Sequence, residues 1–327
     1  MKRLALALVD SLFLMRLPLL LPVWTILLLG WVTGHPEGGT GWGLGGWSTV
    51  PCLRVLLASV FGFSLVVAAI YVVNQIADIE SDRINHKLFL LPHGFISVGA
   101  AWAISAVCLV GGMAIGVRAG RALTWLFAVS AVLGYLYNLP PVRLKDHALG
   151  GTVANCVGHG ILTYLVGWCA SKCGNCMDGG QLWSGLLSSL SPALANGAVF
   201  LATTIPDAAG DRATGKRTFC VRFGTRVTSV AAAVMCLGAL LASALVEHHQ
   251  WVMAVPSGVS LVFFGRLAFS GRAEDAYPAF RWPVLLLSIT VMLMVPLYGV
   301  LLGMTFLVSR VYYRRRFGFE YPSFTSK

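Results

Sequence analysis

The chain has 327 residues, of which 57% are hydrophobic and 11% are charged, and its mean hydropathy is +0.76. Soluble globular domains carry about 25% charged residues, so this composition excludes a soluble globular protein and indicates a polytopic membrane protein. The formal net charge is +11. We expect these charges to lie beside a lipid bilayer, and we expect no nucleic-acid partner.

Apolar runs long enough to cross a bilayer, about 17–25 residues each, recur along the chain. The sequence therefore predicts an all-α protein with a single transmembrane domain over residues 1–327. The first residues have the basic start of a signal peptide, but Asp10 and Arg16 interrupt the apolar run and no convincing cleavage site follows. We expect this first helix to remain in the mature protein. About nine spans are expected, near residues 12–33, 52–76, 97–117, 122–139, 149–170, 183–206, 227–246, 250–269 and 282–309.

Basic residues fall mainly in loops that share one side of the membrane if the N-terminus is cytoplasmic. Cytoplasmic loops carry an excess of Lys and Arg, so the charges favour this orientation. The tail "RVYYRRRFGF" disagrees. About nine spans would place this basic tail on the opposite side, so either the early helices set the topology or the count is off by one.

An acidic segment, "NQIADIESDR", ends the second apolar run. Asn74, Asp78 and Asp82 follow one another at i, i+4 and i+8, so they share one face of a helix with 3.6 residues per turn. A single Asp at a membrane border is commonly just a solvated loop residue. Like charges one turn apart repel, however, and a set of carboxylates there is expected to hold a hard divalent cation.

The loop "YNLPPVRLK", residues 137–145, falls on the same side by the count of spans. Its Arg143 and Lys145 follow a rigid Pro-Pro turn and are candidates for binding phosphate. In the next apolar run, Asn155 and His159 lie at i and i+4 on one face. His159 is either an acceptor-binding group or general base, or a membrane histidine bonded to a neighbouring helix.

Three cysteines crowd the segment "CASKCGNC" on the opposite side of the membrane: Cys169, Cys173 and Cys176. A lone C-x-x-C lacks the second ligand pair of a typical zinc site. A disulfide is possible if that side is oxidising, and unpaired loop thiols are the other interpretation.

A second acidic segment, "TTIPDAAGDR", repeats the spacing of the first with Thr203, Asp207 and Asp211. The two segments emerge on the same side of the membrane, because an even number of predicted spans separates them. This weak internal repeat suggests two halves that face each other, roughly residues 1–140 and 141–310.

Basic residues follow the second segment, among them Arg212 and Lys216. They are either anchors of the positive-inside type or groups that neutralise an anion. Mg²⁺ binds through a few carboxylates together with substrate phosphates. The simplest ligand for both acidic segments is therefore a diphosphate held by Mg²⁺ between them.

The chain resembles the UbiA-type intramembrane prenyltransferases over nearly its whole length. Three motifs carry the resemblance: N-x-x-x-D-x-x-x-D, Y-x-x-P-P-x-x-x-K, and D-x-x-x-D followed by G-K-x-T. Their residues here are Asn74, Asp78, Asp82, Tyr137, Pro140, Pro141, Lys145, Asp207, Asp211, Gly215, Lys216 and Thr218. Arg16 before Pro18 is similar to an early Arg-Pro of the family. The segment "NHKLFLLPHGFIS" lacks the Arg-Pro that many relatives have after the first box, which leaves the acceptor open.

The resemblance implies nine helices around a central cavity. The count of spans and the basic loops indicate that the active site faces the cytoplasm. The resemblance also implies that Asp78, Asp82, Asp207 and Asp211 are catalytic and hold two Mg²⁺ ions on an isoprenyl diphosphate. The diphosphate leaves, an allylic carbocation forms, and an acceptor captures it. The residues expected to bind substrate are Asn74, Arg16, Tyr137, Lys145, Lys216, Arg212, Asn155 and His159.

The function expected on this basis is transfer of an isoprenyl group to a small aromatic or related acceptor, as in lipoquinone or other isoprenoid lipid synthesis. Glycerol phosphate, chlorophyll-type and haem acceptors stay open. A phosphatidyltransferase using a CDP-alcohol fits less well, because the motif D-G-x-x-A-R is not found in the required form. A cation or anion transporter would place its carboxylates near the bilayer centre, whereas these lie at helix ends.

Overall fold

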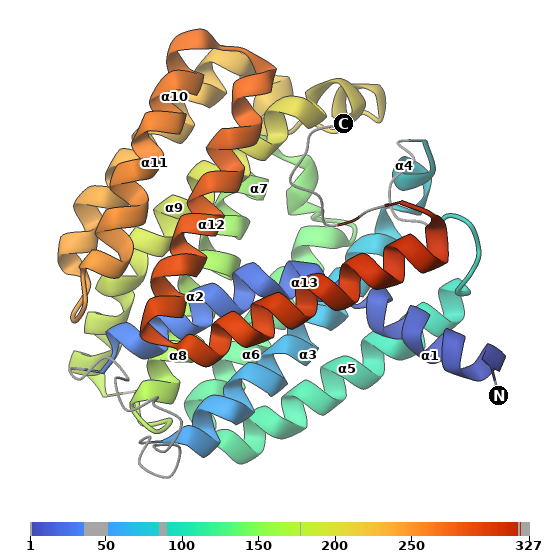
Figure 1. Cartoon of the computed structure of the whole chain (residues 1–327), viewed down its shortest axis with the longest axis horizontal. Helices are drawn as coiled ribbons and strands as arrows, with labels where there is room; N and C mark the ends of the chain where they lie inside the picture. Colours follow the sequence, from blue (N-terminus) through green and yellow to red (C-terminus); the bar gives the residue numbers. More distant parts are fainter. Residues whose placement is uncertain (1, 36–51, 85–89, 177, 320, 322–327) are drawn as a thin grey trace.

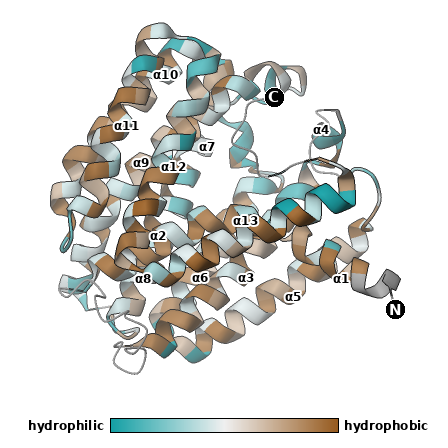
Figure 2. Ribbon diagram, in the orientation of Figure 1, coloured by the Kyte–Doolittle hydropathy of each residue, from teal (hydrophilic) through white to brown (hydrophobic). Residues whose placement is uncertain are grey.

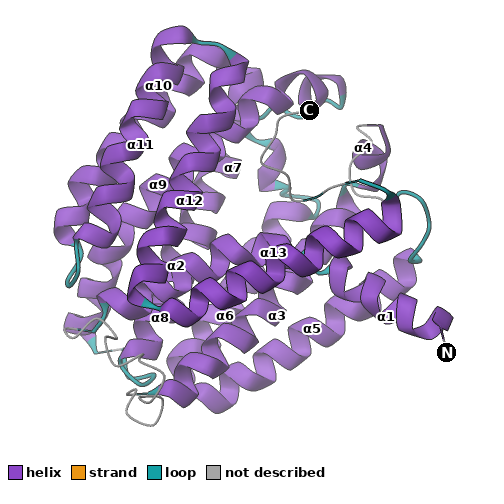
Figure 3. Ribbon diagram, in the orientation of Figure 1, coloured by secondary structure: helices purple, strands orange, loops and turns teal. Residues whose placement is uncertain are grey.

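The computed structural model describes residues 2–35, 52–84, 90–176, 178–319 and 321. Within these residues the secondary structure is helical, and one isolated bridge pairs His147 with Arg217 (Figure 3). The predicted all-α fold is confirmed. The α-helices are α1 (Lys2–Leu14), α2 (Leu20–Thr33), α3 (Leu53–Ala77), α4 (Ile79–Ile84), α5 (Val98–Ala119), α6 (Arg121–Asn138), α7 (Ala148–Asn155), α8 (Thr163–Ser171), α9 (Gly179–Ala213), α10 (Phe219–Ala242), α11 (Trp251–Ser270), α12 (Ala276–Met294) and α13 (Pro296–Phe317). Short 3₁₀ or π segments are η1 (Leu17–Leu19), η3 (Leu144–Asp146), η4 (Cys156–Leu162), η5 (Ser243–Leu245) and η6 (Ala273–Asp275).

Eight helical segments of the described chain are long and apolar enough to cross a membrane. Hydrophobic residues follow the lengths of these helices, and hydrophilic residues gather at the end of the bundle that holds α4 (Figures 1 and 2). The helix α6 occupies the predicted span 122–139 but is not among the eight. The eight segments are Leu6–Thr33, Leu53–Ala77, Val98–Ala119, Ala148–Ser171, Gly179–Ala213, Phe219–Leu245, Trp251–Ser270 and Ala273–Met294.

Close contact between α2 and α8 forms the centre of the main core. A Cβ atom at Gly167 would overlap the carbonyl oxygen of Leu27, and one at Gly30 would overlap that of Tyr164. Small residues let membrane helices approach this closely. Large side chains then fill the surrounding space, and Trp31 and Tyr164 are fully buried there.

The apolar run predicted as one span near 282–309 is two helices. The helix α12 ends at Met294, Val295 is non-helical with φ −131° and ψ 79°, and Pro296 begins α13. Proline cannot donate the hydrogen bond that would continue the preceding helix. The second helix turns back across the bundle towards α1 (Figure 1), so the basic tail returns to the end of the bundle that holds α4.

Two disulfides close the opposite end of the bundle. Cys52 pairs with Cys173, and Cys169 pairs with Cys176. Cys52 immediately precedes α3 and Asp78 immediately follows it. A helix of 25 residues rises about 37 Å at 1.5 Å per residue, so the disulfides and the first acidic segment lie at opposite ends of the bundle.

Candidate active site

A cavity of about 520 Å³ lies where the ends of α3, α9 and α13 meet the turn after α1. Acidic side chains and aromatic side chains line it together. Its carboxylates are those of Asp78, Asp82 and Asp207, so both predicted acidic segments contribute to one cavity. The remaining lining residues are Phe13, Arg16, Pro18, Leu19, Asn74, Gln75, Leu90, Tyr313, Phe317, Phe319 and Tyr321.

The first acidic segment adopts nearly the predicted geometry. The helix α3 ends at Ala77 and Asp78 is its C-terminal cap, but the backbone N–H of Asp82 still donates to the carbonyl of Asp78 at 2.8 Å. The helical repeat therefore continues into α4. As predicted, Asn74, Asp78 and Asp82 face the same cavity.

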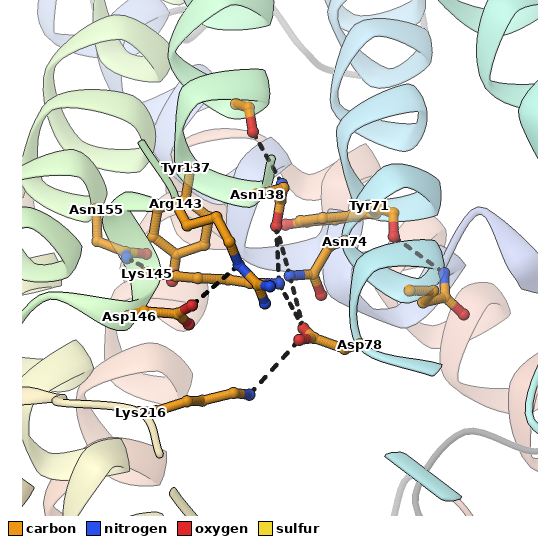
Figure 4. A network of polar contacts seen from close by, with 12 residues as sticks. Tyr71, Asn74, Asp78, Tyr137, Asn138, Arg143, Lys145, Asp146, Asn155 and Lys216 are labelled. Carbon is orange, nitrogen blue, oxygen red and sulfur yellow. Dashed lines mark hydrogen bonds and ion pairs between the residues drawn. The ribbon is translucent and has the colours of Figure 1, made fainter. Parts of the chain in front are cut away.

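Asp78 is held between two lysines from different loops (Figure 4). The ammonium Nζ of Lys145 lies 2.7 Å from Asp78 Oδ2, and that of Lys216 lies 3.5 Å from Oδ1. Burial raises the pKa of Asp78, but the two ammonium groups outweigh burial, so the pKa of this carboxyl lies below its ordinary value. Asp78 is therefore a carboxylate at neutral pH.

Amide side chains complete this network. Asn74 Nδ2 donates to Asp78 Oδ2 at 3.2 Å and to Asn138 Oδ1 at 2.7 Å, and Lys145 Nζ donates to the same Asn138 oxygen at 3.4 Å. Sequence reasoning missed Asn138, although it directly follows Tyr137 in the Pro-Pro motif. Its position inside that motif was the available signal.

The second acidic segment lies at the end of α9, whose interior contains Pro206. Asp207 lines the cavity, whereas Asp211 Oδ2 accepts a hydrogen bond from the buried hydroxyl of Thr218 at 3.0 Å. Asp211 is not among the described residues that line the cavity. The structure therefore brings three of the four predicted carboxylates to one cavity and gives the fourth a contact with the loop that follows.

The two basic loops are joined to each other. The backbone N–H of Arg217 donates to the carbonyl of Asp146 at 3.0 Å, beside the bridge to His147. Gly215, with φ +75°, makes the turn that precedes Lys216. This link places both Lys145 and Lys216 in contact with Asp78.

The remaining basic candidates differ from one another. Arg16 lines the cavity, and its Nε is buried without a hydrogen-bond partner among the described residues. Arg212 is exposed and is not among the lining residues described. Arg143 pairs with Asp146 at 2.9 Å.

Tyr137, Asn155 and His159 line a second, smaller cavity of about 70 Å³. Asn155 Nδ2 donates to the hydroxyl of Tyr137 at 3.3 Å, and the His159 ring lies 6.2 Å from that of Tyr71. The helix widens to a π-helix over Cys156–Leu162, which contains His159. Of the predicted substrate-binding residues, Asn74 and Arg16 line the larger cavity and Tyr137, Asn155 and His159 line the smaller one. The lining residues described for the two cavities do not include Lys145, Lys216 or Arg212. Lys145 extends between the Tyr137–Asn155 pair and Asp78 (Figure 4).

Residues 38–289 match the model of the UbiA prenyltransferase family. The chain belongs to this family. The resemblance inferred from the motifs is therefore confirmed, and the chain is an integral, multi-pass membrane protein.

Curated relatives of the family have different acceptors in their names. The chain is 27% identical over 205 residues to 2-acylphloroglucinol 4-prenyltransferase of Humulus lupulus, covering 61% of this chain and 48% of that protein. It is 33% identical over 203 residues to digeranylgeranylglyceryl phosphate synthase of Methanoculleus marisnigri, covering 61% of this chain and 68% of that protein. The chain thus spans about half the length of the plant relative.

Solved structures of the family share the fold. A UbiA homologue from Archaeoglobus fulgidus bound to GPP and Mg²⁺ aligns with a TM-score of 0.69 and 17% identity, over 90% of this chain and 99% of that one. The same homologue bound to DMAPP and Mg²⁺ aligns with a TM-score of 0.67. At this level of identity the likeness establishes the arrangement of helices.

Proposed function

We propose that the protein transfers an isoprenyl group from an allylic diphosphate to a small acceptor, releasing diphosphate. The observation that carries this proposal is that carboxylates from both acidic segments line one cavity together with Arg16. Lys145 and Lys216 contact one of these carboxylates, that of Asp78. Acidic and basic groups in one place suit a ligand that brings both metal cations and phosphate oxygens. A diphosphate with its divalent ions is such a ligand.

The donor set fits Mg²⁺. Carboxylate oxygens are the ligands that this ion prefers, and Asp78, Asp82 and Asp207 present them to the cavity. Among the described residues, no group of three or more His, Cys, Asp or Glu side chains is already close enough to enclose an ion. We propose that Asp78 and Asp82 hold one ion and Asp207 and Asp211 a second, with phosphate oxygens completing the coordination; bound Mg²⁺ would neutralise charge on the leaving diphosphate.

The basic residues of the site have a separate role in this proposal. Positive groups fixed where negative charge develops stabilise the transition state. Lys145 and Lys216 already lie beside Asp78, and the Nε of Arg16 has no hydrogen-bond partner within the described part of the chain. We assign all three to the phosphate oxygens as the C–O bond breaks.

Part of the organic substrate is assigned to the smaller cavity and its surroundings, and the rest is assigned to the acidic cavity. Tyr137 and Asn155 form one of its walls, and His159 stands near Tyr71 within it. We propose that these side chains contact the isoprenyl group or the acceptor. Arg212 is exposed, so we assign it to the surface from which the diphosphate enters and not to the cavity.

We propose an aromatic acceptor, with glycerol phosphate as the second candidate. The aromatic side chains in the wall of the acidic cavity offer stacking surfaces, and the relative from Humulus lupulus is named for an aromatic acceptor. The archaeal relative's name, in contrast, contains glyceryl phosphate. Only the products can distinguish the two.

The test is product identification with purified protein in lipid vesicles. Allylic diphosphates of several lengths are offered with Mg²⁺ and with phenolic acceptors or glycerol phosphate derivatives, and products are identified by mass. A prenylated phenol supports the proposal, and a prenylated glycerol phosphate replaces its acceptor. If every combination fails with folded protein, prenyl transfer is the wrong assignment.

We also propose that the acidic end of the bundle faces the cytoplasm. Disulfides persist on the oxidising side of a membrane, and both disulfides lie at the other end. The basic last turn of α13 lies at the acidic end, as the positive-inside rule requires of the cytoplasmic side. Two independent features therefore support the same orientation.

A further inference from the structure

The C-terminal helix α13 lies outside the part of the chain that matches the family, yet it reaches the candidate active site. The family match ends at residue 289, and α13 spans Pro296–Phe317. Tyr313 and Phe317 of this helix line the acidic cavity, as do Phe319 and Tyr321 just beyond it. We call these four residues the aromatic wall.

A buried ion pair fixes the end of α13 to α1. Asp10 is only 3% exposed, and Arg316 donates to it with both Nε and Nη2, at 3.3 and 3.2 Å. The hydroxyl of Tyr312 donates to the same carboxylate at 2.7 Å, and the ring of Phe13 stacks on Tyr312 at 3.6 Å. A buried charge with this many partners is costly to separate from them, so the helix end has a defined position.

A second attachment joins α13 to the residues between the first acidic segment and α5. The guanidinium of Arg316 lies 4.4 Å from the ring centroid of Phe95, and Phe317 meets the same ring at 5.9 Å. The aromatic wall is therefore held from two sides, by α1 and by the segment that precedes α5.

The members of the aromatic wall contact one another. Ring centroids of Tyr313 lie 5.0 Å from Tyr321 and 5.5 Å from Phe319, and Phe317 lies 6.1 Å from Phe319. This apolar cluster lines the same cavity as the carboxylates of Asp78, Asp82 and Asp207. The rings of Phe317 and Phe319 carry no oxygen or nitrogen that binds a hard cation or a phosphate, so their contribution concerns the organic part of the substrate or the water around it.

We infer that the aromatic wall keeps water away from the reacting carbon and so decides whether the isoprenyl group goes to the acceptor or to water. This inference rests on the proposed function. When the C–O bond breaks, its electron pair leaves with the diphosphate and an allylic cation remains. If water supplies the next electron pair, a C–O bond forms, a proton is lost and a prenyl alcohol results; if the acceptor supplies it, the acceptor loses the proton and is prenylated. Closed active sites suppress this kind of side reaction by excluding water, and aromatic faces also stabilise a cation.

The experiment measures the ratio of prenyl alcohol to prenylated acceptor for the full-length protein in lipid vesicles. This ratio does not depend on the fraction of protein that is folded. For Tyr313→Ala and Phe317→Ala we expect it to rise about fivefold or more, because each loses a ring that shields and stabilises the cation. Phe317→Leu, which keeps an apolar side chain, should restore most of the wild-type ratio. The control is Phe269→Ala, since Phe269 is 98% exposed on α11 and should leave the ratio unchanged.

Weakening the buried Asp10–Arg316 ion pair gives an independent variant. Asp10→Asn removes the charge that Arg316 contacts. It should also raise the ratio of prenyl alcohol to prenylated acceptor, although it replaces no residue of the aromatic wall. If the wild-type protein transfers prenyl groups and the ratio stays unchanged in Tyr313→Ala and Phe317→Ala, this inference is wrong and the proposed function stands. Absence of Mg²⁺-dependent diphosphate release from the folded wild-type protein would overturn the proposed function, and this inference with it.

Discussion

Asp78 is the residue at which distant parts of the chain meet. Helical spacing predicts that it shares a face with Asn74 and Asp82, and all three line one cavity. Its contacts with Lys145 and Lys216 were not predictable from spacing, because they depend on how two loops are joined in space. The sequence identified the participants, and the fold determined which of them touch.

We expect Asp78→Asn to lower turnover by at least about 100-fold, because it removes a charge proposed to bind metal and to position diphosphate. Turnover is measured as diphosphate release, and folding as the thermal unfolding temperature in detergent. Glu274→Gln is a matched control, since Glu274 is exposed in η6. Near-normal turnover of Asp78→Asn would remove this residue from the site.

Lys145→Ala should weaken binding of the diphosphate substrate more than that of the acceptor. A hydrogen bond to a charged group contributes about 1.5–3 kcal/mol, which corresponds to roughly a tenfold or greater rise in KM for the diphosphate. Arg226→Ala, at an exposed position of α10, serves as the control. A rise confined to the acceptor KM would contradict the assignment of Lys145 to phosphate.

At the level of the helices, hydropathy predicts most spans well and fails where a helix breaks within an apolar run. The run near 282–309 stays hydrophobic across Val295, and only Pro296 signals the break. The same limitation concealed the role of α13, because its contacts with Asp10 link residues at opposite ends of the sequence. No local pattern encodes such a contact.

The tight crossing of α2 and α8 predicts a specific loss of stability. Gly167→Ala would overlap the carbonyl of Leu27, and we expect the free energy of unfolding to fall by about 1–3 kcal/mol because the backbones must separate. Gly265→Ala is the matched control, since a Cβ there meets nothing within 4 Å. Equal unfolding temperatures for the two variants would show that the helices do not pack this closely.

For the whole molecule, composition and motif order were sufficient to predict the membrane class, the all-α fold and the family. The division into two related halves, roughly 1–140 and 141–310, stays a prediction. Two features could not be predicted from the sequence. One is the pairing of the cysteines, which the spacing left open. The other is the aromatic wall, whose residues come from the C-terminal part of the chain and line a cavity with residues from the N-terminal part. Both depend on long-range contacts that periodicity does not record.

The orientation can be tested with a membrane-impermeant maleimide on sealed vesicles of known sidedness. We expect Cys52 and Cys173, which are not buried, to be unreactive until their disulfide is reduced, and then to react only from the non-cytoplasmic side. The buried, unpaired Cys220 serves as an internal control that should stay unreactive throughout. Labelling from the cytoplasmic side would reverse the proposed orientation.

In our proposal, both acidic segments and their lysines form one site that activates an allylic diphosphate with Mg²⁺. The most direct measurement is diphosphate release by lipid-reconstituted protein, with Mg²⁺ and after its removal by a chelator, in the wild type and in Asp207→Asn. We predict release that requires Mg²⁺, returns when the ion is restored, and is lost in Asp207→Asn although the protein stays folded. Release that persists without divalent ions, or that is unchanged in Asp207→Asn, would show that the two acidic segments do not form a Mg²⁺-dependent site.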